Sequence, residues 1–328
     1  MLRRILAVFE PFVLMLLATV AIASILPPVG AAATGFGWAA DAGIVLLFFL
    51  HGAKLSREAI VDGLRNVRLH AAVFATTFIL FPLLGLGITA LPPFASLLDP
   101  LLASGVLFLT LLPSTVQSSI AFTSIARGNV AAAVCSASFS NLAGIVVTPL
   151  LVTLLMKGAG HAHVSLAQVE GIVLQLLAPF VIGHLSRPWT GAWIARRKTL
   201  VTTVDRGSIL LVVYTAFGAA VADGLWHRVS GTDLAVLLAI CGVLLAIVLA
   251  ATWFAARALH LPRADAIVLL FCGSKKSLAS GVPIAGVLFP AVQVGMVILP
   301  VMLFHQIQLI ACAVIARRLG ASEPSPRT

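Results

Sequence analysis

Long apolar stretches, each about the length of a membrane span, alternate with short polar segments along almost the whole chain. A helix needs about 20 apolar residues to cross a hydrocarbon core of about 30 Å. The stretches are continuous and do not alternate residue by residue, which favours helices over the strands of a membrane β-barrel. The pattern predicts ten membrane-spanning helices, approximately over residues 6–26, 37–53, 69–91, 100–126, 129–156, 166–186, 206–226, 232–257, 264–290 and 293–317.

Two polar segments do not fit this pattern. The segment Ser56–Asn66 is too polar to span, and it predicts a short amphipathic helix on the membrane surface. The tail Ala321–Thr328 is polar and is expected to be disordered.

The composition agrees with a chain embedded in lipid. Apolar residues make up 60% and charged residues only 10% of the sequence, whereas soluble domains carry about 25% charged residues. The net charge of +10 is compatible with a nucleic-acid partner or with basic loops that set membrane topology. The positions of the basic residues decide between these alternatives.

With the N-terminus inside, all but four of the 21 Lys and Arg residues fall on the cytoplasmic side. The exceptions are Lys157 and Arg228 outside, and Lys275 and Lys276 within the ninth predicted helix. This asymmetry follows the positive-inside rule. It predicts a multi-pass inner-membrane protein with both termini in the cytoplasm, and it argues against nucleic acid as a partner.

The two halves of the chain resemble each other. Ala178-Pro179-Phe180-Val181 in the sixth helix repeats the Pro-Phe-Val of Glu10-Pro11-Phe12-Val13 in the first, about half the chain away. Five helices per half is an odd number, so the second half enters the membrane in the opposite orientation. The sequence therefore predicts one transmembrane transporter domain over 1–328, built from inverted repeats at about 1–157 and 165–318.

The fourth helix of each half contains a break near mid-span. Pro113 interrupts one apolar run and Gly273 interrupts the other, and a serine follows each. Broken helices at matching positions mark the substrate site in many secondary transporters, although Pro and Gly also simply kink packed membrane helices. The candidate binding residues around the breaks are polar, namely Ser114, Thr115, Gln117, Ser118, Ser119, Ser274, Lys275, Lys276 and Ser277.

Lys275 and Lys276 are the most informative of these residues. A cation at mid-membrane depth costs at least about 2.5–3.5 kcal/mol, so such a residue indicates function unless an ion pair explains it. No Asp or Glu lies at the same predicted depth. The sequence leaves two roles open, because a lysine can attract an anionic substrate or lose its proton and couple transport to protons.

The fifth and tenth helices also carry polar groups near mid-depth. Asn141 and His305 are candidate site residues, although a single membrane Asn or His often only bonds a neighbouring helix. An imidazole titrates near neutral pH, which makes His305 a second candidate for proton coupling.

No motif points to an enzyme, a bound cofactor or a metal. The sequence lacks a phosphate-binding GxxxxGK[ST] loop, a dinucleotide fingerprint and an HExxH motif. Each of the four cysteines lies within an apolar stretch without metal-ligand spacing. We therefore expect no catalytic residues, no cofactor and no metal site.

Four segments carry a resemblance to a known family. They are Phe48-Phe49-Leu50-His51-Gly52-Ala53-Lys54-Leu55-Ser56, Leu112-Pro113-Ser114-Thr115-Val116-Gln117-Ser118-Ser119, Ala126-Arg127-Gly128-Asn129 and Phe271-Cys272-Gly273-Ser274-Lys275-Lys276-Ser277. Together they resemble the bile acid:sodium symporter superfamily, in its solute carrier family 10 member-7-like branch. The resemblance implies ten helices, a five-plus-five inverted repeat, and broken helices 4 and 9 that cross at mid-membrane.

The sequence departs from the sodium-coupled members of that family at their ion sites. Ser118-Ser119 stand where those members have Ser-Asn, Phe271 aligns with a glutamate, and Lys275-Lys276 align with Gln-Asn. A charged lysine repels sodium at short distance, so we expect that the usual sodium sites are not used. The same departures count against bile acids as substrates. Nothing in these residues resembles a calcium cage, which takes several carboxylates.

The sequence thus predicts an all-α secondary transporter of a small organic anion, working by alternating access. The alternative from another class is a non-transporting membrane regulator that acts through a partner protein, for example in ion homeostasis. A cavity that reaches Lys275 or Lys276 favours the transporter, whereas a closed bundle with both lysines bonded to protein favours the regulator.

Overall fold

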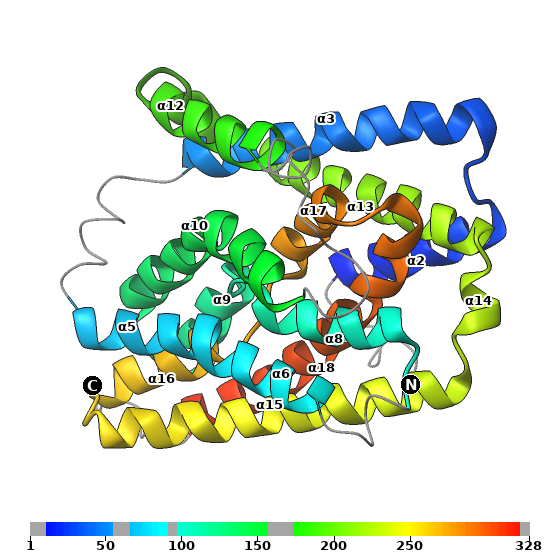
Figure 1. The fold of residues 1–328 in the computed structure, drawn as a ribbon. Helices are drawn as coiled ribbons and strands as arrows, with labels where there is room; N and C mark the ends of the chain where they lie inside the picture. Colours follow the sequence, from blue (N-terminus) through cyan, green and yellow to red (C-terminus); the bar gives the residue numbers. More distant parts are fainter. Residues whose placement is uncertain (1–10, 55–65, 91–96, 157–172, 322–328) are drawn as a thin grey trace.

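The computed structural model describes residues 11–54, 66–90, 97–156 and 173–321, and every regular element in these ranges is a helix (Figure 1). The predicted amphipathic segment at 56–66, the tail after 321 and the starts of the first and sixth predicted helices lie wholly or largely outside the described residues. The elements are α2 Pro11–Ile25, α3 Gly30–Lys54, α5 Val67–Ala75, η1 Thr76–Leu80, α6 Phe81–Ala90, α8 Pro100–Leu111, α9 Gln117–Ile125, α10 Val130–Leu155, η2 Val173–Leu177, α12 Ala178–Arg196, α13 Lys198–Ala222, α14 Leu225–Arg228, α15 Gly231–Ala258, α16 Arg263–Gly273, α17 Leu278–Leu288 and α18 Ala291–Ala321.

Seven helices within the described residues are long and apolar enough to cross a membrane. They are α3, α5 to α6 as one helix, α10, α13, α15, α16 to α17 as one span, and α18. Apolar helices Leu14–Ile25 and Pro100–Leu111 are shorter. An integral membrane protein is therefore confirmed, while the count of ten spans stays a prediction.

Three helices begin or end away from their predicted bounds. The predicted helix 37–53 starts already at Gly30, and the predicted helix 166–186 continues through Pro188 to Arg196. The predicted helix 206–226 begins at Lys198, so most of the expected loop at 187–205 is helical. The prediction was wrong there because it ended helices where the apolar run ended, whereas Arg, Lys and Ala are good helix formers in a polar environment.

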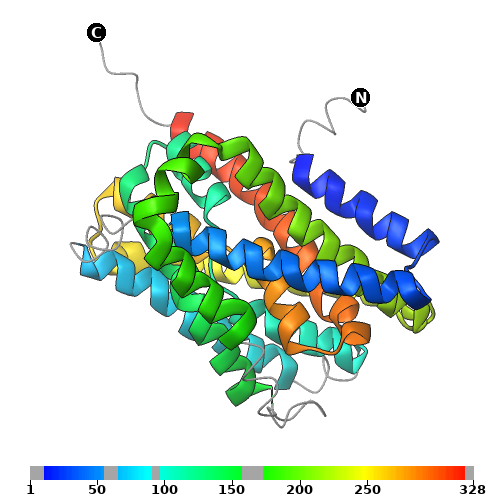
Figure 2. The same ribbon diagram turned by 90° about the horizontal axis from the view of Figure 1, so that it is seen from above.

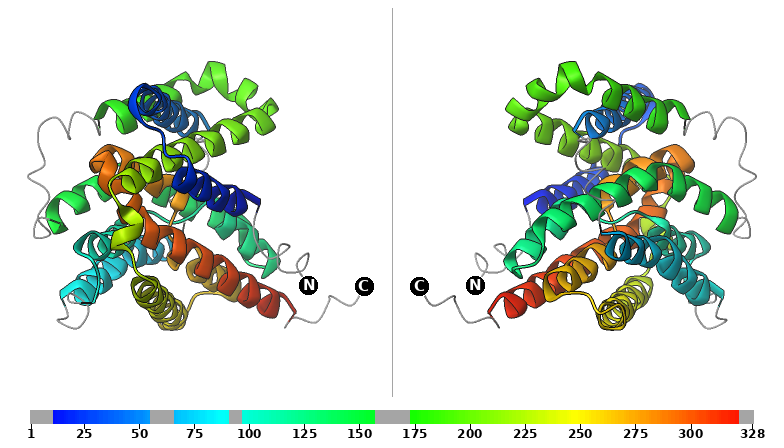
Figure 3. Two further views of the ribbon diagram at one scale, coloured as in Figure 1. Left: turned by 90° about the vertical axis from the view of Figure 1, so that its right-hand side faces the viewer. Right: turned by 90° about the vertical axis from the view of Figure 1, so that its left-hand side faces the viewer.

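The helices form two groups that meet at the centre. In one group, α3 packs on α12 and α13, and α2 packs on α13; Figure 1 shows α3 and α12 along the top. In the other group, α15 packs on α16 and α18, and α5 packs on α10 and α16, with α15 at the opposite edge of the molecule from α12 (Figure 3). The helices α13 and α18 run side by side and join the groups (Figure 2).

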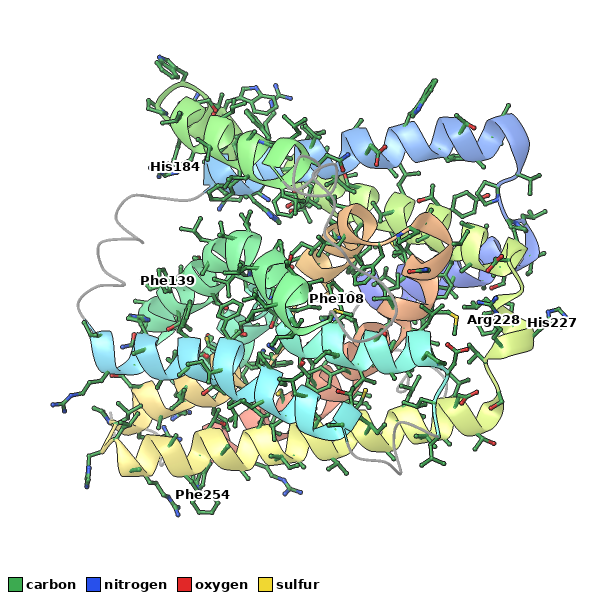
Figure 4. All side chains as sticks on the ribbon, viewed as in Figure 1. Phe108, Phe139, His184, His227, Arg228 and Phe254 are labelled. Carbon is green, nitrogen blue, oxygen red and sulfur yellow. The ribbon has the colours of Figure 1, made fainter. Side chains whose placement is uncertain are left out.

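Large apolar side chains cover much of the outer surface. Phe254 on α15 and Phe139 on α10 are exposed, and Figure 4 shows Phe254 pointing away from the bundle. Many buried positions, by contrast, carry serine, threonine or lysine. Apolar exteriors and polar groups directed inward are expected of a bundle whose solvent is lipid.

The contact between α3 and α12 depends on two glycines. A methyl group added at Gly52 would lie 2.0 Å from the carbonyl oxygen of Phe180, and one at Gly183 would lie 2.0 Å from that of Phe49. Each glycine therefore lets the backbone of the other helix approach within a distance that no side chain permits, as small residues do in membrane helix pairs.

We predict that Gly52→Ala or Gly183→Ala destabilises the protein by about 1–3 kcal/mol, the usual cost of overpacking. Thermal unfolding of the purified protein in detergent measures the effect. Gly242→Ala in α15 is the control, because nothing lies within 4 Å of a methyl group there. Unfolding of both test variants at or above the wild-type temperature would contradict the proposed contact.

Candidate functional site

The two breaks predicted from Pro113 and Gly273 lie against each other. The chain leaves helical geometry at Leu112–Val116, between α8 and α9, and at Ser274–Ser277, between α16 and α17. The amide of Ser277 donates a hydrogen bond to the carbonyl of Pro113 at 2.8 Å. The hydroxyl of Ser119 donates to the carbonyl of Phe271 at 3.1 Å. Residues far apart in the sequence are thus joined at one place.

Local sequence explains each break. Leu112 is extended (φ −75°, ψ 156°), which is the conformation favoured for a residue that precedes proline. The other break ends where the Ser277 hydroxyl accepts a hydrogen bond from the amide of Ser280 at 3.1 Å and so caps α17.

At each break, side chains of a neighbouring long helix form hydrogen bonds to both the backbone amide and the backbone carbonyl of one residue. On α10, the Ser140 hydroxyl accepts from the amide of Ser114 at 3.0 Å, and the Asn141 side chain donates to the Ser114 carbonyl at 2.8 Å. On α18, the Gln308 side chain accepts from the amide of Lys276 and donates to its carbonyl, both at 2.9 Å. In each half of the chain, the helix that follows the broken helix thus forms hydrogen bonds with backbone groups that the break leaves without a helical partner.

The ammonium group of Lys276 is completely buried and surrounded by backbone carbonyls. It donates to Thr77 at 2.8 Å, to Thr110 at 2.8 Å and to Leu112 at 2.7 Å. An ammonium has three donors, so all of them are used. The ring of Phe81 lies 4.1 Å from the nitrogen and adds a cation–π contact.

The three acceptor carbonyls are available because two helices are irregular there. Thr110 and Leu112 lie at the C-terminal end of α8, where the last carbonyls of a helix lack intrahelical partners. Thr77 lies in η1, a π-helical turn inside the α5–α6 helix, and such turns often occur at functional sites. The sequence suggested a carboxylate as the structural alternative for the two lysines, but the structure provides Lys276 with carbonyls instead.

Lys275 is also completely buried and points to a different set of groups. Its ammonium donates to the Ser118 hydroxyl at 3.3 Å and lies 4.4 Å from the centre of the Phe122 ring. The Ser118 hydroxyl in turn donates to Thr115 at 3.0 Å, and Thr115 and Ser119 share a hydrogen bond of 3.1 Å. Lys275 therefore donates into a chain of hydrogen-bonded hydroxyl groups, and it does so from the side of Ser118 that faces away from the cavity described next.

A cavity of about 290 Å³ lies on the other side of these hydroxyls, between the two groups of helices. Six of the predicted site residues line it, namely Thr115, Gln117, Ser118, Asn141, Ser277 and His305. The other five, Ser114, Ser119, Ser274, Lys275 and Lys276, are buried and do not line it. The breaks thus contain residues that face the cavity and residues that hold the backbone.

The opposite wall of the cavity was not predicted from the sequence. It consists of apolar side chains from Phe12, Phe48 and Phe180, together with polar residues His51, Lys54, Thr202, Asp205 and Arg206. Lys54 and Asp205 form an ion pair. Arg206 lies over the ring of Phe12 at 5.4 Å. The charged residues lie near helix ends, where the sequence alone indicated only membrane topology.

The groups at the cavity can bind a polar solute with several hydrogen bonds. Gln308 shares a hydrogen bond of 2.8 Å with Nδ1 of His305 through its amide nitrogen, which can only donate. The neutral imidazole therefore carries its proton on Nε2 and is itself a donor. No cluster of three or more His, Cys, Asp or Glu side chains that could hold a metal occurs among the residues that the structure describes.

Comparison with known proteins gives a consistent result. The model of the SBF-like CPA transporter family matches residues 10–321. An uncharacterised protein of Pseudomonas aeruginosa is 55% identical over 309 residues, covering 94% of this chain and 92% of its own. "Putative symporter YfeH" of Escherichia coli is 54% identical over 313 residues, covering 95% of this chain and 93% of its own.

A more distant relative is named sodium/bile acid cotransporter 7-A, from Xenopus laevis. It is 26% identical over 274 residues, which cover 82% of this chain and 78% of its own. The family match extends over nearly the whole chain, including both helix breaks and the cavity between the helix groups. The chain therefore belongs to the SBF-like CPA transporter family.

Proposed function

We propose that this protein is a secondary active transporter of a small organic anion, which binds in the cavity beside the two helix breaks. The observation that carries the proposal is the position of this cavity, between two groups of helices and against the joined breaks. In transporters built from repeats, substrate binds where discontinuous helices meet.

The proposed architecture is a five-plus-five inverted repeat of ten membrane helices. Three paired features support it. Each half has one broken helix, each break is bonded by the long helix that follows it, and the packing of α3 on α12 (second helix on sixth) has its counterpart in the packing of α2 on α13 (first helix on seventh). In the proposed orientation, which the positive-inside rule supports, Lys54 and Arg196 to Lys198 lie at the cytoplasmic side and both termini lie inside the cell.

The arrangement of two helix groups around the cavity supports the proposal of alternating access. The cavity has one wall on α2, α3, α12 and α13 and the other on α9, α10, α17 and α18. A rocking movement of one group against the other would open the cavity to one side of the membrane and then to the other.

The charges around the cavity favour an anion. Lys54, His51 and Arg206 contribute basic groups, whereas Asp205 is the one carboxylate among the described lining residues and is paired with Lys54. Lys275 adds a positive charge behind Ser118. Charges act over longer distances where the surroundings are apolar, so Lys275 need not touch the solute to attract it.

Sodium is not expected to occupy the family's usual sites here. The ammonium of Lys276 already binds three carbonyl oxygens, which are the ligands that an alkali cation would need. Phe271 offers only a backbone carbonyl, and that carbonyl accepts from Ser119. Coupling to protons through His305, Lys275 or Lys276 stays open.

A non-transporting membrane regulator acting through a partner protein is the second candidate. One observation favours it: both lysines are enclosed, bonded to protein groups and absent from the cavity wall. Transport measurements separate the two candidates.

We predict that proteoliposomes containing the protein take up an organic anion from a panel of small carboxylates and sulfonates, and that sodium is not required. Gln117→Ala should reduce the uptake by about fivefold to tenfold, the loss expected for one hydrogen bond. Gln117 lines the cavity and is exposed, so its substitution leaves the fold intact.

The control for this experiment is Gln293→Ala, since Gln293 on α18 does not line the cavity. An imposed pH gradient tests proton coupling in the same assay. Uptake that depends on sodium would contradict the proposed loss of the ion sites. Absence of uptake for the whole panel under every gradient would favour the regulator.

We also predict that Lys276→Met destabilises the protein by about 3 kcal/mol or more, because three buried carbonyls lose their donor. The measurement is thermal unfolding in detergent. Arg318→Met at an exposed position outside both pockets serves as the control and should change stability by less than about 0.5 kcal/mol. Equal stability of the two variants would show that the ammonium does not hold the breaks.

A further inference from the structure

A second pocket lies outside the cavity described above. It has a volume of about 700 Å³, is open on one side, and is lined by the end of α3, the C-terminal half of α12 and the start of α13. Its polar lining is basic, because it includes Lys54, His184, Arg187 and Lys198. No Asp or Glu occurs among the described residues that line it.

The outer surface next to this pocket is suited to lipid. On α12, Leu185 is 63% exposed, Trp189 is 80% exposed and Trp193 is 51% exposed. Tryptophan is enriched where a membrane protein meets the headgroup region. The basic pocket is thus bordered by a helix face that carries a membrane-interface pattern.

One polar atom of the pocket residues lacks a partner. Nδ1 of His184 is buried and makes no hydrogen bond within the described structure. Figure 4 shows His184 where α12 crosses α3, and a methyl group added to Gly52 of α3 would lie 2.9 Å from the His184 amide. A buried ring nitrogen without a partner is costly, and a ligand oxygen would bond it if the ring turned toward the pocket that His184 lines.

Gly191 leaves room for the side chain of Arg187 on the surface of α12. A methyl group at Gly191 would lie 3.0 Å from Cγ of Arg187, so the glycine lets the arginine side chain lie along the helix. An arginine guanidinium can bind a phosphate through two parallel hydrogen bonds. Pockets of this type between membrane helices bind anionic lipid headgroups.

We propose that this pocket binds the phosphate headgroup of an anionic phospholipid from the surrounding membrane. Arg187 and Lys198 bind the phosphate, and the acyl chains lie along the exposed apolar face of α12. The same chemistry would suit free phosphate, but the lipid-facing wall favours a headgroup that arrives from the bilayer.

The proposed lipid site also touches the cavity of the proposed transporter. Lys54 and Thr202 line both spaces, and the ion pair between Lys54 and Asp205 lies between them. A phosphate near Lys54 would compete with Asp205 for its ammonium group. The lipid site itself does not depend on the proposed transport function.

Native mass spectrometry of the purified protein tests the proposal with lipids that differ only in the headgroup. Phosphatidylglycerol should be retained at least about tenfold more than phosphatidylcholine with the same acyl chains. The double variant Arg187→Gln with Lys198→Gln should lose this preference. The double variant Arg196→Gln with Arg257→Gln removes the same charge outside the pocket and should keep it.

Equal retention of both lipids by the wild type would overturn the proposal. Equal loss of the preference in the two double variants would also overturn it, since general surface charge would then explain the binding. Displacement of phosphatidylglycerol by millimolar inorganic phosphate would assign the pocket to a soluble anion instead. Lys198→Gln alone, at an exposed position, repeats the test with a smaller expected loss if the double variant unfolds.

Discussion

The buried ammonium group of Lys276 is the interaction on which the centre of this protein depends. A charge in an apolar interior loses its hydration, and only well-placed hydrogen bonds offset that loss. Here the nitrogen binds the carbonyls of Thr77, Thr110 and Leu112 and lies over the ring of Phe81. Because these groups come from η1, from α8 and from the first break, one side chain ties the second break to the N-terminal half of the chain.

Close packing of the first break accompanies this polar contact. A methyl group added at Gly144 would lie 2.6 Å from Cβ of Pro113, and one at Gly281 would lie 2.5 Å from Cδ1 of Leu112. The first break is therefore packed closely by α10, which carries Gly144, and by α17, which carries Gly281. The residues left to meet a solute are those that turn toward the cavity, such as Gln117 and Ser118.

The features predicted from the sequence were those that leave a direct physical trace in it. Continuous apolar runs predicted membrane helices, and Pro113 and Gly273 predicted two breaks because these residues interrupt helices. The sequence did not separate Ser118, which faces the cavity, from Ser119, which bonds a backbone carbonyl, since both are serines in neighbouring positions. That division depends on how the two halves pack.

Other features had no sequence signal that could be interpreted in isolation. In the π-helical turn at Thr76–Leu80 the amide of Phe81 bonds the carbonyl of Thr76, and Pro82, five residues after Thr77, has no amide hydrogen, so the carbonyl of Thr77 is left to bind Lys276. Arg206 and His51 were assigned to membrane topology or passed over, because only the folded chain brings them to the cavity opposite Asn141. Wall residues contributed by another helix group can be found only from tertiary structure.

The most direct test of this account is the sodium dependence of unfolding of the wild-type protein. A ligand that binds the folded state at 100 times its dissociation constant stabilises it by about 2.7 kcal/mol. If Lys276 has taken over the role of a bound cation, the unfolding temperature in sodium chloride should equal that in choline chloride at the same ionic strength. A saturable increase specific to sodium would contradict the account and indicate that a sodium site remains.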